Sequence, residues 1–314
     1  MAEIWPKQDE AKYWSGFNFP NWTLVISIQP MIQKLTTTNH DRDIAGLKYI
    51  YPVMSRRAGG LSIGVNFNPN NACNWRCIYC QVPDLKRGAA PTMDLALLED
   101  ELRFFLHQVQ HADFFEQFNV APEQRIIKDI AISGNGEPTS LDNFEQAVTL
   151  IGQIACETGV FPSSHFVLIT NGSLIHQANV QAGLKQLATY HGEIWFKLDS
   201  ATEQGRKLIN NSVQSQQKLL ENLRIATQLC PTKLQTCVLH FHGKTWTDSE
   251  KRAYLQLLQE LQRQQIVLQK IMLYSLARPS FQPEAAELEQ VNSEEMHALA
   301  TDIKALGYDV SVNA

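Results

Sequence analysis

Short apolar runs alternate with amphipathic stretches over most of this chain. The runs are rich in β-branched and aromatic residues and are bounded by glycine, proline or asparagine, which is typical of buried strands. The stretches between them carry apolar residues three or four positions apart, which predicts helices. Strands are expected at Leu61–Phe67, Ile126–Ser133, His165–Thr170, Glu193–Leu198, Leu234–Phe241 and Val267–Tyr274, and helices at Asp94–Gln110, Leu141–Glu157, Ile175–Leu187, Ser215–Leu229 and Ser249–Gln264.

Strands that alternate with helices in this way predict parallel β/α units with right-handed crossovers. The fold class is therefore α/β. Six such units favour a partial (β/α)6 barrel, and an open doubly wound sheet is the alternative that periodicity alone leaves open.

The two ends of the chain do not follow this pattern. Residues 1–59 are rich in aromatic residues, and we expect them to form an extension that packs on the core, with a short strand at Leu24–Ile28. The barrel is assigned to residues 60–279. After it we expect a linker over residues 280–292, a helix at Ser293–Leu306 capped by Ser293, and a last strand at Tyr308–Val312.

Composition limits the class of protein. The 314 residues are 44% hydrophobic, which is ample for a core, and the net charge of −5 gives no global attraction to nucleic acid. No apolar run is long enough to span a membrane, and the first ten residues are too polar for a signal peptide. Scattered cysteines without a pairing pattern fit a reducing compartment, so we expect a cytoplasmic protein.

Cys73, Cys77 and Cys80 lie on one loop with C-x3-C-x2-C spacing. The loop follows the strand predicted at Leu61–Phe67, and the C-terminal ends of strands are where α/β proteins build their sites. Thiolates select iron–sulfur clusters, zinc or copper(I). A four-iron cluster held by three cysteines leaves one iron free, so the triad favours a reactive cluster; a fourth ligand from elsewhere in the chain is the alternative.

A zinc site and a disulfide are the other interpretations of these cysteines. Structural zinc sites pair two C-x2-C knuckles or add a close histidine pair, whereas His107 and His111 lie well downstream on a predicted surface helix. The remaining cysteines, Cys156, Cys230 and Cys237, are isolated, and we expect Cys156 to be buried on an apolar helix face. An odd trio in a chain without a signal peptide does not indicate a disulfide framework.

Polar residues follow two further predicted strands. Gly134 and Gly136 flank Asn135, and Glu137 precedes a proline, so backbone groups of this turn can approach a ligand closely; a tight βα loop is the structural alternative. Asn171 follows the third strand, where its amide suits a ribose or a carboxylate, or serves a capping turn.

Lys197 and Asp199 end the fourth strand and share one face, and Ser200 follows them. Two such charges facing into a barrel are unfavourable unless they are paired or bind a ligand, which favours function. His240 and His242 flank Phe241 at the end of the fifth strand, either as core residues or as substrate contacts. Five basic residues could form a positively charged rim around the site, or they could be ordinary solvated side chains. They are Arg56, Arg57, Lys86, Arg87 and Arg278.

The cysteine triad, with Tyr79 directly before its last member, resembles the signature of the radical S-adenosylmethionine (SAM) superfamily. The resemblance implies an enzyme in which three cysteines hold a [4Fe–4S] cluster and SAM binds the fourth iron. An electron from an external donor of the flavodoxin or ferredoxin type cleaves SAM, and the resulting radical abstracts a hydrogen atom from a substrate.

The resemblance also implies roles for the strand ends. The turn at Gly134, Asn135, Gly136 and Glu137 is similar to the GGEP-type motif that binds the SAM amino group, with Asn135 in place of the second glycine. Tyr79 and Asn171 belong to the same cofactor site. The resemblance implies ribose contacts by Asp199 or Ser200, and a contact of Lys197 to a SAM or substrate carboxylate.

Four segments together resemble the wyosine-synthase-like radical SAM proteins, whose best-known members rebuild a guanine base in tRNA. They are Arg56–Arg57, Ser133–Thr139, Leu168–Ser173 and Lys197–Ser200, and the resemblance covers roughly residues 51–210. The tRNA enzymes carry additional cysteines for a second cluster, whereas the additional cysteines of this chain are isolated from one another in the sequence. The acidic charge balance also does not favour a tRNA substrate. The substrate is therefore left open, with a nucleoside or tRNA base as one candidate.

Two other functions remain alternatives. A non-catalytic iron–sulfur or zinc binding module would hold metal without affinity for SAM. An activase that generates a glycyl radical on a partner protein would need a tight protein complex, and no segment of the sequence indicates one.

Overall fold

The computed structural model describes residues 45–55, 59–244 and 246–313, and in this part of the chain eight strands form one sheet. Its spatial order is β1-β2-β5-β6-β7-β8-β10-β12. Neighbouring strands are parallel except β1, which is antiparallel to β2. The strands are β1 (Ile50–Ser55), β2 (Gly60–Asn66), β5 (Ile127–Ser133), β6 (His165–Thr170), β7 (Glu193–Lys197), β8 (Thr232–Cys237), β10 (Lys270–Tyr274) and β12 (Val310–Asn313).

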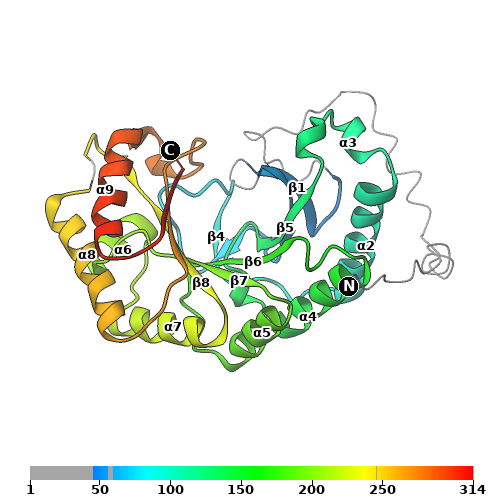
Figure 1. Cartoon of the computed structure of the whole chain (residues 1–314), viewed down its shortest axis with the longest axis horizontal. Coiled ribbons are helices and arrows are strands. Elements are labelled where there is room, and N and C mark those ends of the chain that lie inside the picture. The colour runs from blue at the N-terminus through cyan, green and yellow to red at the C-terminus, as the bar shows by residue number, and fades with distance from the viewer. Residues whose placement is uncertain (1–44, 56–58, 245, 314) are drawn as a thin grey trace, which may run out of the picture. The chain divides into compact units, whose positions relative to one another are not determined.

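Helices cover the convex side of the curled sheet and leave its concave side open (Figure 1). The long helices are α2 (Leu95–His111), α4 (Phe144–Glu157), α5 (Ala178–Thr189), α7 (Gln216–Leu229), α8 (Asp248–Arg263) and α9 (Ser293–Ala305). The short helices are α3 (Phe114–Gln117) and α6 (Glu203–Asn210), with 3-10 turns η2 (Pro122–Gln124), η3 (Pro138–Ser140) and η4 (Pro283–Glu287). The α/β class and the partial barrel are thus confirmed.

The two faces of the sheet differ because side chains alternate along each strand. Leu61, Ile63 and Val65 of β2 are fully buried in the core between the sheet and the helices. Ser62 and Gly64, which alternate with them, face the concave side and line a cavity there. The fold therefore has its hydrophobic core on one side of the sheet and an open cavity on the other.

The strand prediction was wrong at two places. Residues 50–55, assigned by sequence to the extension, form β1 at one edge of the sheet. The strand predicted at Leu234–Phe241 ends at Cys237, and Leu239–Phe241 forms β9 in a separate antiparallel pair with β11 (Leu288–Gln290). The predicted linker over 280–292 therefore contains η4 and β11.

Two local predictions also need correction. The side chain of Asn292, not Ser293, caps α9, because its Oδ1 accepts the backbone N–H of Glu295. Cys156 is exposed on α4 rather than buried. The strand predicted at Leu24–Ile28 lies outside the described residues.

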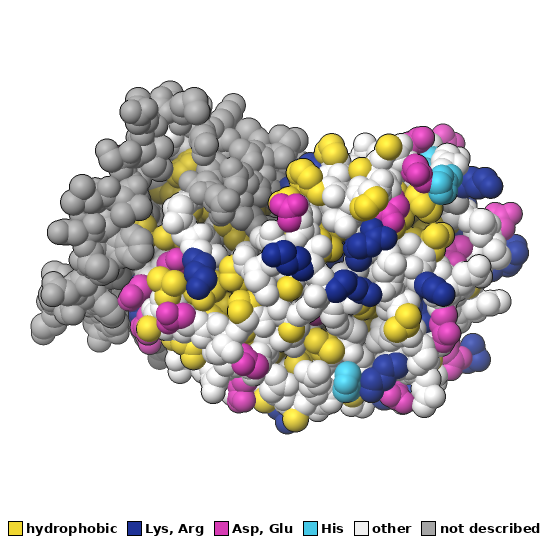
Figure 2. Space-filling view, turned by 180° about the vertical axis from the view of Figure 1, so that it is seen from behind, with side chains coloured by type: hydrophobic (Ala, Val, Ile, Leu, Met, Phe, Trp, Pro, Cys, Tyr) yellow, Lys and Arg dark blue, Asp and Glu magenta, His cyan; other side chains and the backbone are white. Residues whose placement is uncertain are grey.

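Charged side chains of both signs cover the surface seen in Figure 2, where Lys and Arg lie across the middle of the described part and Asp and Glu surround them. No helix among the described residues combines the length and hydropathy needed to cross a membrane.

Candidate functional site

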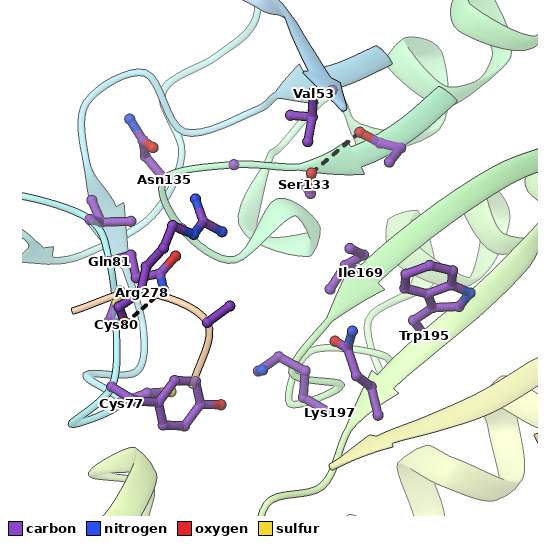
Figure 3. Close-up of a pocket in the computed structure, with 18 of the residues that line it drawn as sticks. Val53, Cys77, Cys80, Gln81, Ser133, Asn135, Ile169, Trp195, Lys197 and Arg278 are labelled. Atoms are coloured by element: carbon purple, nitrogen blue, oxygen red, sulfur yellow. Dashed lines mark hydrogen bonds between the residues drawn. The ribbon is translucent and has the colours of Figure 1, made fainter. Parts of the chain in front are cut away.

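A cavity of about 410 Å³ opens on the concave side of the sheet. Its walls come from β1, β2, the cysteine loop, and the inner faces and C-terminal ends of β5 to β8 and β10 (Figure 3). Asp199 and Ser200 are the two predicted site residues that do not line it. The predicted residues that do are Cys73, Cys77, Tyr79, Cys80, Gly134, Asn135, Gly136, Glu137, Asn171 and Lys197.

The cysteine loop is fixed by backbone hydrogen bonds on two sides. On one side, the N–H groups of Arg76 and Ile78 donate to the carbonyls of Asn210 and Ile209 at the end of α6, at 3.2 and 2.8 Å. On the other side, the N–H of Phe281 donates to the Cys80 carbonyl at 2.9 Å. These bonds hold the three thiols against the cavity independently of any metal.

The protein supplies donors to two of the sulfur atoms. The backbone N–H of Trp75 donates to Cys73 Sγ at 3.4 Å, and Asn210 Nδ2 donates to Cys77 Sγ at 3.2 Å. Burial nevertheless raises the pKa of both thiols to about 12. Without metal they are therefore protonated at neutral pH, and bound cations would be needed to ionise them.

The described residues hold no group of three His, Cys, Asp or Glu side chains arranged to bind a single metal ion. A [4Fe–4S] cluster makes a different demand, because each of its cysteine ligands binds a separate iron. Three thiols that share one cavity, with N–H donors to the sulfur atoms of Cys73 and Cys77, fit that demand.

The turn after β5 lies directly against the cysteine loop. Gly134 has a φ of 151°, and the Asn135 N–H donates to Asn66 Oδ1 at 3.0 Å. Asn135 Nδ2 donates to Asn71 Oδ1 at 2.6 Å, whereas Asn135 Oδ1 is buried and has no hydrogen-bond partner in the described part of the chain. A buried acceptor of this kind beside the cavity fits a ligand with a donor such as an ammonium group.

The close approach at Gly136 predicts a large effect of one methyl group. A Cβ at this position would lie 1.9 Å from the Ala72 carbonyl oxygen, so Gly136→Ala must push the turn away from β3 (Ala72–Cys73). We expect the free energy of unfolding to fall by about 1–3 kcal/mol. Urea denaturation of the metal-free chain measures it. Gly88→Ala is the matched control, because its Cβ would meet Ala72 only at 3.5 Å; equal stabilities of the two variants would contradict the close approach.

Glu137 ties the ends of β5 and β6 together. Its carboxylate accepts hydrogen bonds from the backbone N–H and hydroxyl of Thr139, from the hydroxyl of Thr170 and from the backbone N–H of Asn171. Burial raises the pKa of this carboxyl group. Asn171 extends the connection, because its Nδ2 donates to Asn74 Oδ1 in the cysteine loop at 2.8 Å. Both side chains therefore position the walls of the cavity.

Lys197 projects into the cavity from β7, across from Cys77 (Figure 3). Its ammonium donates to the Tyr274 hydroxyl at 2.8 Å and lies 5.0 Å from the centre of the Tyr79 ring. Burial lowers the pKa of Lys197, but nearby Asp199 and Tyr274 outweigh this effect, so the pKa is raised. The side chain therefore stays cationic at neutral pH, which suits an anionic ligand group.

The structure places Asp199 and Ser200 behind the cavity wall. Asp199 is 1% exposed, and its carboxylate accepts hydrogen bonds from the Tyr79 hydroxyl, Asn210 Nδ2 and the backbone N–H of Cys237. Ser200 is fully buried and donates to Glu250 at 2.6 Å. Both side chains are engaged within the protein, so the expected ribose contacts have no support in this geometry.

The two histidines and, among the described basic candidates, Lys86 and Arg87 also lie away from the cavity. His240 and His242 pair with Glu295 and Glu287 at 3.1 and 2.8 Å, because the chain leaves the main sheet before it reaches them. Lys86 and Arg87 form β4, paired with β3, and are exposed. Arg56 and Arg57 lie outside the described residues.

Arg278 is the basic candidate that lines the cavity, where it lies beside the cysteine loop and reaches toward Asn135 (Figure 3).

The sequence-based prediction did not include the residues on the concave face of the sheet that line the cavity before the C-terminal ends of the strands. The signal was the two-residue alternation, which puts Ser62 and Gly64, Asp129 and Ala131, and Trp195 with Lys197 on one face. The wall residues that were not predicted include Tyr51, Ser62, Asp129, Ser133, Trp195, Gln235 and Tyr274.

The sequence model of the radical SAM superfamily matches residues 67–258, more than half of the chain. A UPF0026 protein of Helicobacter pylori is 25% identical over 231 residues, which are 73% of this chain and 66% of that protein. The GTPase Obg of Brachyspira hyodysenteriae is 26% identical over 136 residues, 42% of this chain and 17% of that protein. The matched part of the chain spans less than two thirds of the length of each of these curated relatives.

Solved structures with a similar fold include Streptococcus suis SuiB bound to S-adenosylmethionine, with a TM-score of 0.53 and 9% identity over 82% of this chain and 52% of that one. TYW1 with a lysine–pyruvate adduct bound gives a TM-score of 0.50 and 14% identity over 78% of this chain and 73% of that one. The match to the superfamily's sequence model confirms the superfamily that the cysteine motif predicted. This chain belongs to the radical SAM superfamily, whose enzymes bind a [4Fe–4S] cluster and S-adenosylmethionine.

Proposed function

We propose that this chain is a radical SAM enzyme in which Cys73, Cys77 and Cys80 hold the cluster. The observation that carries the proposal is that these thiols and the strand-end turns of β5, β6 and β7 line one cavity. The cofactors, when bound, supply a strong one-electron reductant and a radical that removes a hydrogen atom from the substrate. The chain contributes ligands, orientation and exclusion of water.

Each residue of the site has a task in this proposal. The three cysteines are the iron ligands. Asn135 Oδ1, a buried acceptor without a partner, receives the ammonium of the methionine moiety of SAM, and the turn at Gly134 to Glu137 forms the wall beside it. Lys197 faces a carboxylate, since it remains cationic. Tyr79 and Asn171 shape the cavity, whereas Asp199 and Ser200 act through the scaffold.

The partners of the reaction are part of the proposal as well. An external electron carrier of the flavodoxin or ferredoxin type is the reductant that the family resemblance implies. A nucleoside or tRNA base is one substrate candidate, supported by the motifs shared with the wyosine-synthase-like proteins. The net charge of −5 favours a small substrate over a whole tRNA.

Anaerobic reconstitution tests the function. The wild-type chain is expected to take up about four irons and to convert SAM to 5′-deoxyadenosine and methionine when dithionite is added. Iron analysis and chromatography measure the two quantities, and a sample without reductant is the control. A chain that binds metal but neither binds nor cleaves SAM would replace this proposal with the non-catalytic binding module.

A further inference from the structure

Asp129 is a buried acid in the deeper part of the cavity. It lies on the inner face of β5, four residues before Ser133, which puts it roughly 13 Å further from the strand end. Its side chain lines the cavity, yet the residue is only 7% exposed. Asp129 Oδ1 accepts a hydrogen bond from the Ser62 hydroxyl, and Oδ2 has no hydrogen-bond partner among the residues described.

A second acid on the same face of the sheet, Glu193, shows how a carboxylate is neutralised within this protein. Glu193, on β7, forms an ion pair with Lys233 at 2.5 Å and accepts a hydrogen bond from Trp195 Nε1 at 2.6 Å. Asp129 makes no ion pair within the described part of the chain. The difference matters because a buried carboxylate without a cation destabilises the folded protein unless a ligand compensates it.

Burial and the nearby carboxylate of Glu193 raise the pKa of Asp129 to about 6, and the Ser62 hydroxyl and His165, its neighbour on β6, only partly oppose this effect. Because the pKa in the unfolded chain is lower, near 3.8, the folded state binds the proton more tightly. Stability therefore falls as pH rises from about 4 to 6, and above this range Asp129 carries a charge that no ion pair within the described part of the chain neutralises. A cationic ligand would recover that stability on binding.

We propose that Asp129 binds a basic nitrogen of the substrate, so that the substrate class is a small compound carrying an amine or amidine. This inference rests on the proposed function, since it places a substrate in the cavity that holds the cofactors. The cavity suits a planar or short polar compound: Ser62 offers a hydroxyl beside Asp129, and Trp195 and Gln235 offer a ring and an amide on strands further across the sheet.

The charges of the cavity also set an orientation. Lys197 and Arg278 lie near the cysteine loop (Figure 3). Asp129 lies four residues before the end of β5, on a part of the wall further from that loop. A substrate whose cationic end binds Asp129 therefore enters with that end first and leaves its opposite end toward the cofactors. The hydrogen atom to be removed is then expected away from the basic nitrogen.

Calorimetric titration with benzamidine, a planar amidinium ion, and benzamide, its neutral analogue, tests the assignment on the reconstituted holoprotein. Wild type should prefer benzamidine by at least about tenfold, and Asp129→Asn should abolish this preference. Glu193→Gln is the matched control, because it removes an acid that lies on the same face of the sheet and already pairs with Lys233. This variant should keep the preference. Equal binding of the two probes by wild type, or a preference that survives in Asp129→Asn, would overturn the proposal.

Two further readouts separate this inference from a folding defect and from the proposed function. Asp129→Asn should melt at a higher temperature than wild type at pH 8, because a buried charge is removed; a lower melting temperature would indicate a structural role and contradict the assignment. Benzamidine should bind wild type more weakly at pH 5 than at pH 8, and pH-independent binding would also count against Asp129. Because no readout requires SAM cleavage, failure of the enzyme assay and failure of probe binding are distinguishable.

Discussion

Cys77→Ala is expected to leave the anaerobically reconstituted chain with little iron and to reduce SAM cleavage at least about a hundredfold. Cys77 lies within the cavity and receives a hydrogen bond from Asn210, so its thiolate has a prepared position. Without it, the cluster would keep two protein ligands on this loop. Changes to the outer partners of metal sites already lower affinity 10–100-fold, and loss of a ligand should exceed that range. Iron content, the visible absorbance of the cluster and the yield of 5′-deoxyadenosine measure the effect.

Cys156→Ala is the matched control for this substitution. It removes the same atom from an exposed position on α4, outside the cavity, and iron content and SAM cleavage should equal those of wild type. If Cys77→Ala also retained a full cluster, the assignment of the triad as the ligand set would be wrong. If both variants lost iron, general oxidation of thiols during reconstitution would explain the loss, and the assay would have to be repeated under stricter exclusion of oxygen.

Asp199→Ala is expected to lower the free energy of unfolding by about 3–5 kcal/mol, the range for removing one member of a buried charged network. The substitution leaves three buried donors without an acceptor: the Tyr79 hydroxyl, Asn210 Nδ2 and the Cys237 backbone N–H. It also removes the nearest carboxylate from Lys197, whose pKa Asp199 helps to raise. For a chain of 314 residues the melting temperature should fall by roughly 5–8 °C.

Ser200→Ala is the control that distinguishes the specific hydrogen bonds of Asp199 from the general effect of changing a buried polar residue. Ser200 is the next residue and is equally buried, but its hydroxyl donates to Glu250 and does not reach the cysteine loop. We expect it to lose about 1 kcal/mol and to reconstitute a full cluster. Asp199→Ala should reconstitute poorly even below its melting temperature, because Tyr79 and Asn210 lose their common anchor. Similar cluster contents in the two variants would contradict this role.

The order of strands and helices from Leu61 to Tyr274 was predictable because each strand is short, apolar on one face and followed by an amphipathic helix. The edge strand β1 was not, since it joins the sheet in antiparallel orientation and breaks the repeating pattern. The end of β8 was also hidden. Leu234–Phe241 reads as one apolar run, but the chain turns away after Cys237 to pair β9 with β11, a contact across some fifty residues that periodicity does not register.

The candidate site was predictable where a motif carries the chemistry. Three cysteines at fixed spacing and two glycines around Asn135 are local signals, and both line the cavity. The sequence predicted that Asp199 faces the cavity, because two-residue alternation along a strand places it on the same face as Lys197. In the structure β7 ends at Lys197, so the alternation does not extend to Asp199. The side chain then points to Tyr79, Asn210 and Cys237 instead of the cavity, a result that depends on three distant segments.

The position of Asp129 on the concave side of the sheet was predictable from the sequence, although it was not predicted. Asp129 alternates with Ile130 and with the other apolar residues of β5, so its position on the concave side could be read from the sequence. The sequence could not show that Asp129 lacks a cationic partner, because this depends on how far Lys233, Lys197 and Arg278 lie from it in the folded chain.

The separation of the core from the concave wall has an evolutionary consequence. The described helices pack against the convex side, and residues such as Ala131, Trp195 and Gln235 line the cavity and do not belong to the packed core, so we expect their exchange to leave that core intact. Descendants of one ancestral chain can therefore acquire new substrates by altering the wall while inheriting an unchanged scaffold. A combinatorial library restricted to these inward positions should contain many well-folded members, which makes the chain a practical starting point for directed evolution.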